Sequence, residues 1–389
     1  MPHNIQEVCS RPEVPSPCFL LDESLLANNL ELLDHVQRES GGTIILALKG
    51  FAMWSSFPQI SRVLAGTTAS SLSEAKLGLE KFGGEVHAYC VAYQDSEMDF
   101  LRKNCHHITV NSLSQWQRFQ HLSRDPDTKA SFGLRINPEY SEVETEIYNP
   151  CRKGTRFGIT AADLNNAGDA IFEGIDGLHF HTMCEQNSDT LERTLTHVEE
   201  KFGKFLHRLK WLNCGGGHHI TRPDYDTALL IRLVKHLRST YDIKVYLEPG
   251  EAVALNTGFL VSTVLDRFSS NGHELAILDT SASAHMPDVL EMPYRPEIIG
   301  AGHPGEKPHT ITLGGTTCLA GDVIGHYSFD QDLKIGDRLV FTDMAHYSMV
   351  KTNHFNGVNH PAIGRYHPET NTVTIDRQFT YQDYRNRLS

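Results

Sequence analysis

Between residues 43 and 250 the sequence repeats one pattern: a short apolar or β-branched run, a polar or glycine turn, and a segment with apolar residues at helical spacing. Eight such runs within about 210 residues match the strand number and the length of a (β/α)8 barrel. An open doubly wound sheet is the alternative, although no GxGxxG motif follows the first run. The runs are TIILALK (43–49), GTTASS (66–71), VHAYCV (86–91), HITVN (107–111), SFGLRIN (131–137), IDGLHFH (175–181), KWLNCGG (210–216) and KVYLEPG (244–250).

After about residue 260 the pattern changes. Apolar and polar residues alternate with a period of two in segments such as ELAILDTSA and DRLVFTDM, and turns such as SNGH and KIGD separate these segments. This alternation predicts antiparallel strands. We therefore expect an α/β chain with a (β/α)8 barrel over residues 23–260 and an antiparallel β-sandwich or barrel-like domain over residues 261–389. A strand within residues 1–22 is expected to join the second domain.

Composition narrows the possible partners. A formal net charge of −13 disfavours nucleic acid and anionic membranes and favours a cationic ligand. No apolar run approaches the ~18 residues of a membrane span, and no secretory signal is visible, so we expect a cytoplasmic protein. The eight cysteines form no CxxC pair, and the adjacent histidines at 106–107 and 218–219 lack the spacing of HExxH, so no metal site is expected.

Catalytic groups of a (β/α)8 barrel lie at the C-terminal ends of its strands. There the sequence places Lys49, Arg135, His181, the Gly215–Gly217 turn and Glu248. Burial lowers the pKa of a lysine and makes it a carbonyl nucleophile. Taken alone, Lys49 is as well explained by a side chain that reaches out of the strand end into solvent.

The glycines and the glutamate are also ambiguous when they are considered separately. The turn Gly215–Gly217 lets backbone amides approach a phosphate, but a plain tight turn would look the same. Glu248 is a carboxylate that could keep a pyridine nitrogen protonated. The combination of amine, phosphate turn and carboxylate, rather than any one of them, predicts pyridoxal phosphate as the cofactor.

The sequence resembles the alanine racemase-like pyridoxal phosphate enzymes, in particular the decarboxylases for diaminopimelate, ornithine and arginine. The resemblance runs from about residue 16 to 360, with all motifs in family order. In the second domain, DMAHY resembles the segment whose Tyr347 reaches the cofactor phosphate, and HFNG (354–357) follows it. The barrel motifs are LALK (46–49), SSLSE (70–74), RFG (156–158), FH (180–181), CGGG (214–217) and EPG (248–250).

Within this family the chain is most similar to the branch that decarboxylates carboxynorspermidine and carboxyspermidine. ALKGFA, HFHTMCEQ, CGGGHHIT, EPGEAV and GTTCLAGDVIG carry that similarity. Three departures from the wider family stand out. Relatives read EPGR where this chain has Glu251, a glycine-serine pair is replaced by Thr182-Met183-Cys184, and Thr68 replaces a frequent aspartate. Asp288 and Glu291 lie where diaminopimelate enzymes place an arginine, so a cationic substrate end is expected there.

The resemblance implies a role for each site residue. Lys49 would hold the cofactor as a Schiff base, with Arg135, His181, Gly215, Gly216, Gly217, Glu248, Gly250 and Tyr347 as further cofactor contacts. Cys318, in the GGTTCLAGD segment, would act as the proton donor from a second subunit, and His181 and Lys49 complete the catalytic set. Substrate contacts are expected from Glu248, Asp279, His285, Asp288 and Asp322.

The resemblance further implies a homodimer with shared active sites and a small cationic amino acid or polyamine as substrate. The predicted reaction is decarboxylation of carboxynorspermidine or carboxyspermidine in polyamine biosynthesis. Decarboxylation of diaminopimelate, arginine or ornithine on the same scaffold stays open, as does racemisation. A non-enzymatic protein that binds pyridoxal phosphate is a further alternative, although such proteins are usually the barrel alone.

Overall fold

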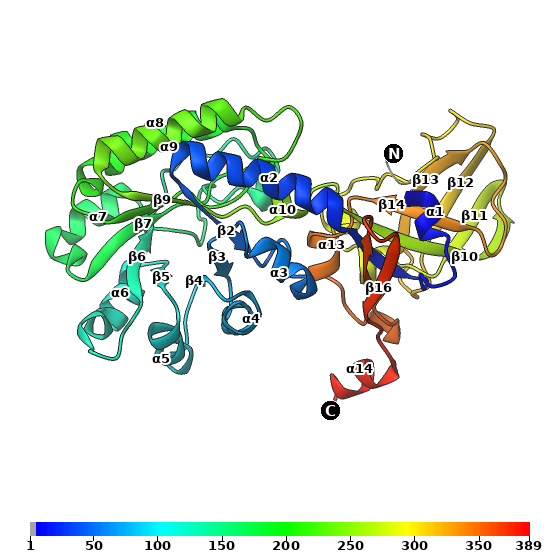
Figure 1. Cartoon of the computed structure of the whole chain (residues 1–389), viewed down its shortest axis with the longest axis horizontal. Coiled ribbons are helices and arrows are strands. Elements are labelled where there is room, and N and C mark those ends of the chain that lie inside the picture. The colour runs from blue at the N-terminus through cyan, green and yellow to red at the C-terminus, as the bar shows by residue number, and fades with distance from the viewer. Residues whose placement is uncertain (1–4) are drawn as a thin grey trace. The chain divides into compact units, whose positions relative to one another are not determined.

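The structure, a computed structural model, describes residues 5–389 (Figure 1). The chain divides into two compact units, Asn29–Val253 and the combination of Met1–Asn28 with Ala254–Ser389. The chain passes between the units within α2 (Glu23–Ser40) and at the end of α10 (Glu251–Ala254). No helix within residues 5–389 has both the length and the apolar character needed to cross a bilayer.

Eight parallel strands close into a barrel in the first unit, which confirms the predicted fold class. Their residues are almost all buried, as expected for parallel strands that are covered on both faces. The last strand pairs with the first, with Thr43 beside Tyr246. The strands are β2 (Thr43–Ala47), β3 (Gly66–Ala69), β4 (Glu85–Tyr89), β5 (His107–Val110), β6 (Ser131–Arg135), β7 (Ile175–His179), β8 (Trp211–Asn213) and β9 (Lys244–Leu247).

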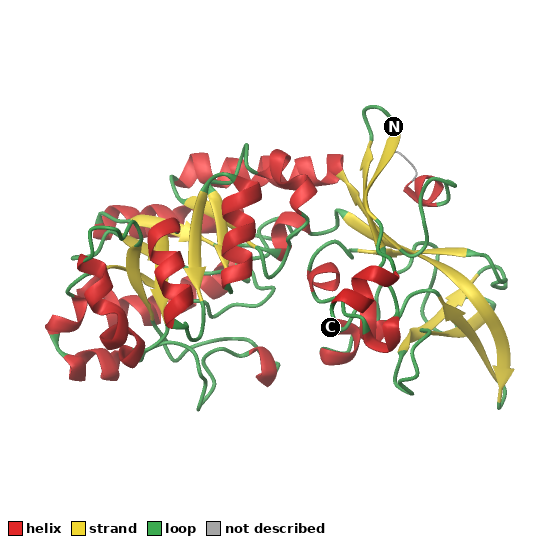
Figure 2. Cartoon of the chain, turned by 90° about the horizontal axis from the view of Figure 1, so that it is seen from below, coloured by secondary structure: helices red, strands yellow, loops and turns green. Residues whose placement is uncertain are grey.

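Helices surround the barrel strands (Figure 2). Serine caps start two of them directly after a strand: Ser71 Oγ accepts from Glu74 N and Ser112 Oγ accepts from Gln115 N, each at 3.2 Å. The helices are α3 (Phe57–Ile60), α4 (Leu72–Leu77), α5 (Asp95–Asn104), α6 (Leu113–Phe119), α7 (Ala161–Ala167), α8 (Ser188–Leu206) and α9 (Thr227–Tyr241), with shorter 3₁₀ or π segments at Trp54–Ser56, Gly78–Phe82, Gln120–Arg124, Glu146–Tyr148 and Asp169–Phe172.

Large rings fill the barrel interior, and glycines make room for them. A Cβ on Gly133 or Gly177 would lie 2.2 or 2.0 Å from the Trp211 ring, so neither strand position tolerates a side chain. The indole stacks on His107 with 4.5 Å between ring centroids. This packed interior holds the strands in a fixed register and therefore fixes the positions of the residues at their ends.

The second unit is built on an eight-stranded sheet in the order β13-β12-β11-β10-β1-β15-β16, with β14 paired to β10. The sheet is mostly antiparallel, but β1 with β15 and β11 with β12 are parallel pairs that the period-two pattern does not reveal. The strands are β1 (Cys18–Asp22), β10 (Gly258–Ser270), β11 (His273–Leu278), β12 (His309–Gly314), β13 (Val323–Phe329), β14 (Arg338–Thr342), β15 (Ala362–His367) and β16 (Thr372–Arg377).

The N-terminal segment is part of the core of this unit. In α1 (Ile5–Cys9), Val8 and Cys9 are buried against Leu20 of β1 and Val340 of β14. The predicted strand in SPCFLLD therefore exists as β1, while residues 1–4 lie outside the described part of the chain. The remaining helices are α11 (Ala282–His285), α12 (Asp288–Glu291), α13 (Tyr347–Val350) and α14 (Tyr381–Asn386), with a 3₁₀ segment at Phe355–Gly357.

Candidate active site

Lys49 lies at the C-terminal mouth of the barrel, two residues beyond the end of β2 rather than inside the strand. Its Nζ is 3.3 Å from Nε2 of His181. The side chain is open to solvent at the mouth, yet the surrounding protein desolvates the amine. This desolvation, together with the Arg135 guanidinium, lowers the pKa of Lys49. A lysine in this state has an increased neutral, nucleophilic fraction.

Glu248 follows β9 directly and is buried among polar partners. Asn213 Nδ2 donates to Oε1 at 2.7 Å, and His179 Nε2 lies 3.3 Å from Oε2. Burial opposes ionisation of the carboxyl, but His179 and Asn213 outweigh it, and the pKa of Glu248 is about 2. The carboxylate is therefore charged at neutral pH, as a partner for a protonated pyridine nitrogen must be.

His179 and Asn213 are site residues that the sequence reasoning missed. Each is the last residue of its strand, β7 and β8 respectively, so the positional rule that selected Lys49 also applies to them. His181, two residues beyond His179, was selected instead. Its Nδ1 accepts from Gly216 N at 3.1 Å, and burial followed by the nearby Lys49 amine places its pKa well below the usual range.

The three consecutive glycines form a turn that no side chain could occupy. Gly215 and Gly217 have φ values of 69° and 82°. A Cβ would lie 2.4 Å from Phe180 O at Gly215, 2.4 Å from Glu248 O at Gly216 and 2.1 Å from Met183 O at Gly217. The rim of the barrel here presents backbone rather than side chains, which fits the phosphate group of pyridoxal phosphate.

Arg135 ends β6 and is almost fully buried. Its guanidinium lies over the rings of Tyr89 and Phe157, 4.6 and 4.4 Å from their centroids, and Nη2 donates to His181 O at 3.2 Å. The side chain is therefore held by the protein itself. Its positive charge still reaches the Lys49 amine, whose pKa it lowers.

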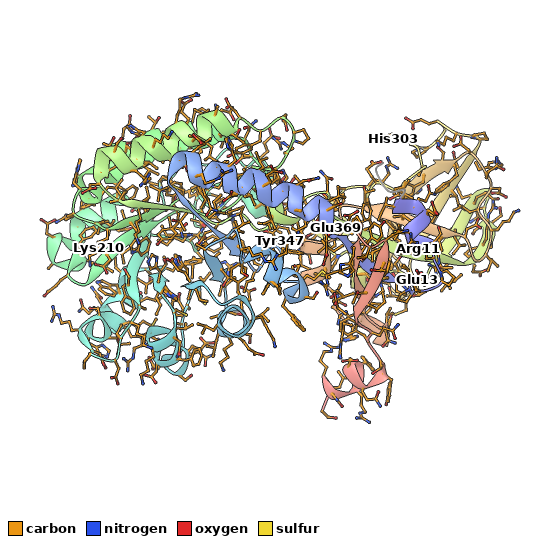
Figure 3. The ribbon with its side chains drawn as sticks, viewed as in Figure 1. Arg11, Glu13, Lys210, His303, Tyr347 and Glu369 are labelled. Atoms are coloured by element: carbon orange, nitrogen blue, oxygen red, sulfur yellow. The ribbon has the colours of Figure 1, made fainter. Side chains whose placement is uncertain are left out.

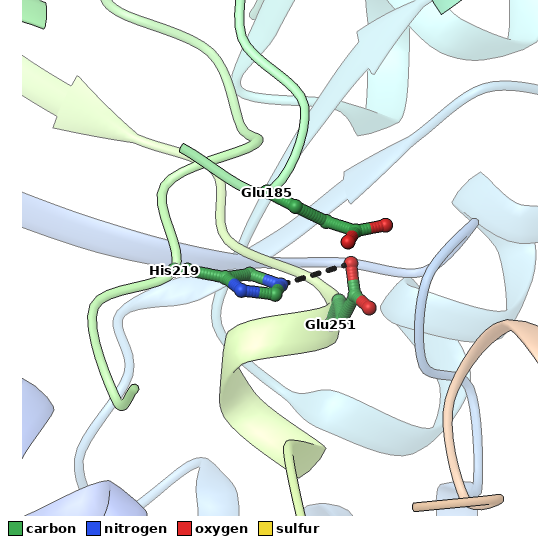
Figure 4. Close-up of side chains that lie close together, drawn as sticks. All are labelled: Glu185, His219 and Glu251. Atoms are coloured by element: carbon green, nitrogen blue, oxygen red, sulfur yellow. Dashed lines mark ion pairs between the residues drawn. The ribbon is translucent and has the colours of Figure 1, made fainter. Parts of the chain in front are cut away.

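A further cluster at the barrel rim joins Glu185, His219 and Glu251 (Figure 4). One nitrogen or oxygen atom from each lies within 4.8 Å of the other two. His219 is buried and neither ring nitrogen makes a hydrogen bond to another of residues 5–389, although Nε2 lies 3.3 Å from Glu251 Oε2. Such a set of acceptors suits a cation. The sequence predicts no metal site here, and it marks Glu251 as a departure from the family without revealing that Glu185 and His219 lie beside it.

The predicted substrate residues of the second unit already have partners within that unit. Asp322 accepts from Ser281 Oγ at 2.9 Å and from Thr317 Oγ1 at 2.6 Å, so it holds the loop that carries Cys318 in a defined position. Asp279 accepts from Ser16 Oγ at 2.6 Å and from Ser262 Oγ at 2.9 Å.

Asp288 and Glu291 both form ion pairs with Lys351. The sequence identified these two acids as a place for a cation, and in the structure one internal ammonium, that of Lys351, pairs with both of them. His285 is fully buried, with Nε2 3.0 Å from Asn359 O, and burial lowers its pKa to about 4.

Cys318 and Tyr347 are the other two predicted residues of the second unit. Cys318 is exposed, and its backbone N–H donates to Asn356 Oδ1 at 2.7 Å. Asn356 belongs to the HFNG motif and has a positive φ of 53°. Tyr347 is half-buried at the start of α13 (Figure 3).

Comparison with known proteins identifies the family. Residues 18–345 match the family model described as pyridoxal-dependent decarboxylase, C-terminal sheet domain. The chain is 46% identical to carboxyaminopropylagmatine decarboxylase of Synechocystis sp., covering 99% of this chain and 98% of the relative. It is 42% identical to carboxynorspermidine/carboxyspermidine decarboxylase of Campylobacter jejuni, covering 96% of this chain and 98% of the relative.

Solved structures agree. The crystal structure of carboxynorspermidine decarboxylase from Campylobacter jejuni complexed with norspermidine is 41% identical in sequence, with a TM-score of 0.89 over 96% of this chain and all of the other. Diaminopimelate decarboxylase from Helicobacter pylori, at 16% identity and a TM-score of 0.83 over 99% of both chains, shares the fold. The barrel-mouth lysine, the ionised glutamate and the glycine turn fit the cofactor of this family. The chain belongs to the pyridoxal-dependent decarboxylases and is a carboxy-lyase that uses pyridoxal phosphate.

Proposed function

We propose that this enzyme removes the α-carboxylate of a carboxylated polyamine, carboxynorspermidine or carboxyspermidine, in polyamine biosynthesis. Full-length identity of 40% and 42% to two enzymes of that name carries the proposal. A fold match at 41% identity to a relative complexed with norspermidine supports it. The free state of all eight cysteines is compatible with a reducing compartment, and we place the enzyme in the cytoplasm.

Pyridoxal phosphate, when bound, supplies an electron sink that accepts the electron pair left behind as carbon dioxide departs. In our proposal Lys49 holds the cofactor covalently through its neutral amine, and His181 lies against the cofactor ring. Glu248 stays ionised and holds a proton at the ring nitrogen, which keeps the ring electron-poor. The phosphate is assigned to the backbone of the Gly215–Gly217 turn and of Gly250. The Arg135 guanidinium and the Tyr347 hydroxyl are proposed as further partners of the cofactor.

Cys318 is proposed to deliver the proton that replaces the carboxylate, acting from a second copy of the chain. Its exposure and the fixing of its loop by Asp322 and Asn356 support a side chain that is presented outward in a defined position. A site completed in this way requires a homodimer.

We assign the amine tail of the substrate to the cluster of Glu185, His219 and Glu251. A primary ammonium donates three hydrogen bonds, and the two carboxylates together with an imidazole nitrogen offer three acceptors. Within the described part of the chain the buried His219 ring makes no hydrogen bond, so an incoming ammonium would give it a partner. The backbone segments that carry Glu251 and Lys49 meet, since a Cβ on Gly50, next to Lys49, would lie 2.9 Å from Glu251 N.

Asp288 remains a second candidate for the tail, with Lys351 as the internal ammonium that the substrate would have to replace. Asp279, Asp322 and His285 are better explained as residues that hold the second unit together, because their side chains are engaged within it.

The 46% identity to carboxyaminopropylagmatine decarboxylase favours a second candidate function. That substrate ends in a guanidinium, which is planar and carries five donors, whereas the triamines end in an ammonium. Mass spectrometry of products from carboxynorspermidine, carboxyspermidine, carboxyaminopropylagmatine, meso-diaminopimelate, arginine and ornithine separates the candidates. Preference for either triamine supports the proposal, and preference for the guanidino substrate or for a simple amino acid contradicts it.

A further inference from the structure

Glu248 is held by two side chains that end neighbouring strands of the barrel. Asn213 is an amide that donates to Oε1 at 2.7 Å. His179 approaches the other oxygen, with 3.3 Å between Nε2 and Oε2, and its ring is 2% exposed. Both carboxylate oxygens are therefore contacted from within the barrel, and each keeps one lone pair for a ligand.

The partner of His179 decides where its proton lies. An ionised carboxylate can only accept, so Nε2 must carry the hydrogen, and Nδ1 makes no hydrogen bond within residues 5–389. A doubly protonated ring would leave a buried N–H without a partner, which disfavours the charged form. His179 is thus a neutral donor to Glu248, and burial lowers its pKa even beside the carboxylate.

A stacked ring fixes the orientation of His179. Tyr89 packs on it with ring centroids 5.3 Å apart and planes 21° from parallel. The Tyr89 ring is itself held in place. Its hydroxyl donates to Asn111 Oδ1 at 2.7 Å, and the Arg135 guanidinium lies over the ring, 4.6 Å from the ring centroid. The imidazole cannot rotate away from Glu248 without breaking this packing.

We infer that His179 is a positioning residue for the cofactor: it donates its Nε2 hydrogen to Glu248 and so keeps that carboxylate ionised and aimed at the ring nitrogen. The inference rests on the proposed role of Glu248. It does not depend on which amine is the substrate.

Binding of pyridoxal phosphate to the folded full-length protein tests the inference without using activity. The dissociation constant is measured from the visible absorbance of the bound cofactor. His179→Leu removes the donor and should raise this constant about tenfold, equivalent to ~1.4 kcal/mol. His179→Gln keeps an N–H within reach and should stay within roughly threefold of the wild type. His107→Leu, which removes a ring of the barrel interior that stacks on Trp211, is the matched control.

The pH dependence of the same constant separates positioning from packing. Without the donor the pKa of Glu248 rises, so His179→Leu should lose cofactor affinity at a higher pH than the wild type as pH is lowered. The inference is wrong if His179→Leu shows wild-type affinity and pH profile, or if His179→Gln is as impaired as His179→Leu. If the leucine variant does not fold, comparison of His179→Gln with the shorter His179→Asn gives the same decision.

Glu248→Gln tests the proposed role of Glu248 as the partner of the cofactor ring nitrogen, on which the inference depends. If Glu248→Gln also binds the cofactor normally, the proposed role of Glu248 is wrong. If Glu248→Gln is impaired and His179→Leu is not, only the role of His179 is wrong. Failure of the carboxylated triamines as substrates would leave both results unaffected.

Discussion

Nζ of Lys49 lies 3.3 Å from Nε2 of His181. Two protonated groups at that distance would repel strongly, and burial disfavours charge on each, so the pKa values of both are lowered. The neutral, nucleophilic fraction of the amine is therefore increased, and charge on the imidazole beside it is disfavoured.

Lys49 should be the single attachment point of the cofactor. Borohydride treatment should fix pyridoxal phosphate on a peptide that contains residue 49, and Lys49→Ala should lose the visible absorbance band and turnover. Lys210→Ala, at an exposed lysine side chain outside the site, should behave as the wild type. Peptide mapping that finds the label on another lysine would refute the assignment.

Cys318 should act from the partner subunit. Lys49→Ala and Cys318→Ala subunits, each inactive alone, should regain activity when they are mixed, because a mixed dimer contains one site without either change. A mixture of Lys49→Ala with Glu248→Gln is the control and should stay inactive, since each change damages the barrel of its own chain and neither site of the mixed dimer is then intact. Absence of complementation in the first mixture, with subunit exchange verified, would place Cys318 in its own chain's site or outside the mechanism.

Glu251 should contribute to binding of the substrate amine. Glu251→Gln removes a charged acceptor and should raise KM for carboxynorspermidine by about tenfold or more, from a loss of ~1.5 kcal/mol or more, with a smaller change in kcat. Glu192→Gln, an exposed acid on α8, should leave both constants unchanged. If manganese or zinc binds at the cluster with one ion per chain and norspermidine does not compete, the cluster is a metal site instead.

Asp288 should matter for selectivity only if the substrate displaces Lys351. Carboxylated triamines should exceed meso-diaminopimelate in kcat/KM by at least about a hundredfold, because a desolvated substrate carboxylate among acids costs several kcal/mol. Asp288→Asn should narrow that gap, mainly by weakening the triamine. The comparison is repeated in a Lys351→Met background. Unchanged triamine kinetics for Asp288→Asn in both backgrounds would show that Asp288 and Lys351 form a structural ion pair with no part in substrate binding.

Acid should destabilise the second unit through His285. Its pKa is 6.5 in an unfolded chain and about 4 in the folded protein, so the unfolded chain binds more protons between these values. The stabilising contribution is complete above pH 6.5 and is lost as pH falls toward about 4; it corresponds to ~3 kcal/mol. His285→Asn should flatten the fall of Tm with pH in this window, and His207→Asn, at an exposed position, should not. Equal slopes for both variants would contradict the prediction.

The barrel was predictable because the same pattern of apolar strand, turn and amphipathic helix repeats along the chain. Runs such as TIILALK and KVYLEPG have mainly apolar residues in their strand portions, as expected of parallel strands covered on both faces, and their spacing leaves room for one helix each. The strand ends then located Lys49, His181 and Glu248 by a positional rule. The parallel pairing of β1 with β15 was not predictable, since alternation reveals a strand but not its neighbour.

The sequence by itself determined which residue types lie at the mouth of the barrel and in what order. The tertiary structure decided how those residues interact. It placed His179 and Asn213 on the two oxygens of Glu248, and it brought Glu185 within reach of Glu251, 66 residues later. It also paired Asp288 and Glu291 with Lys351, about sixty residues away. Charge and hydrogen bonding act over a few ångströms, and only the closed barrel and the folded sheet bring such distant residues that close.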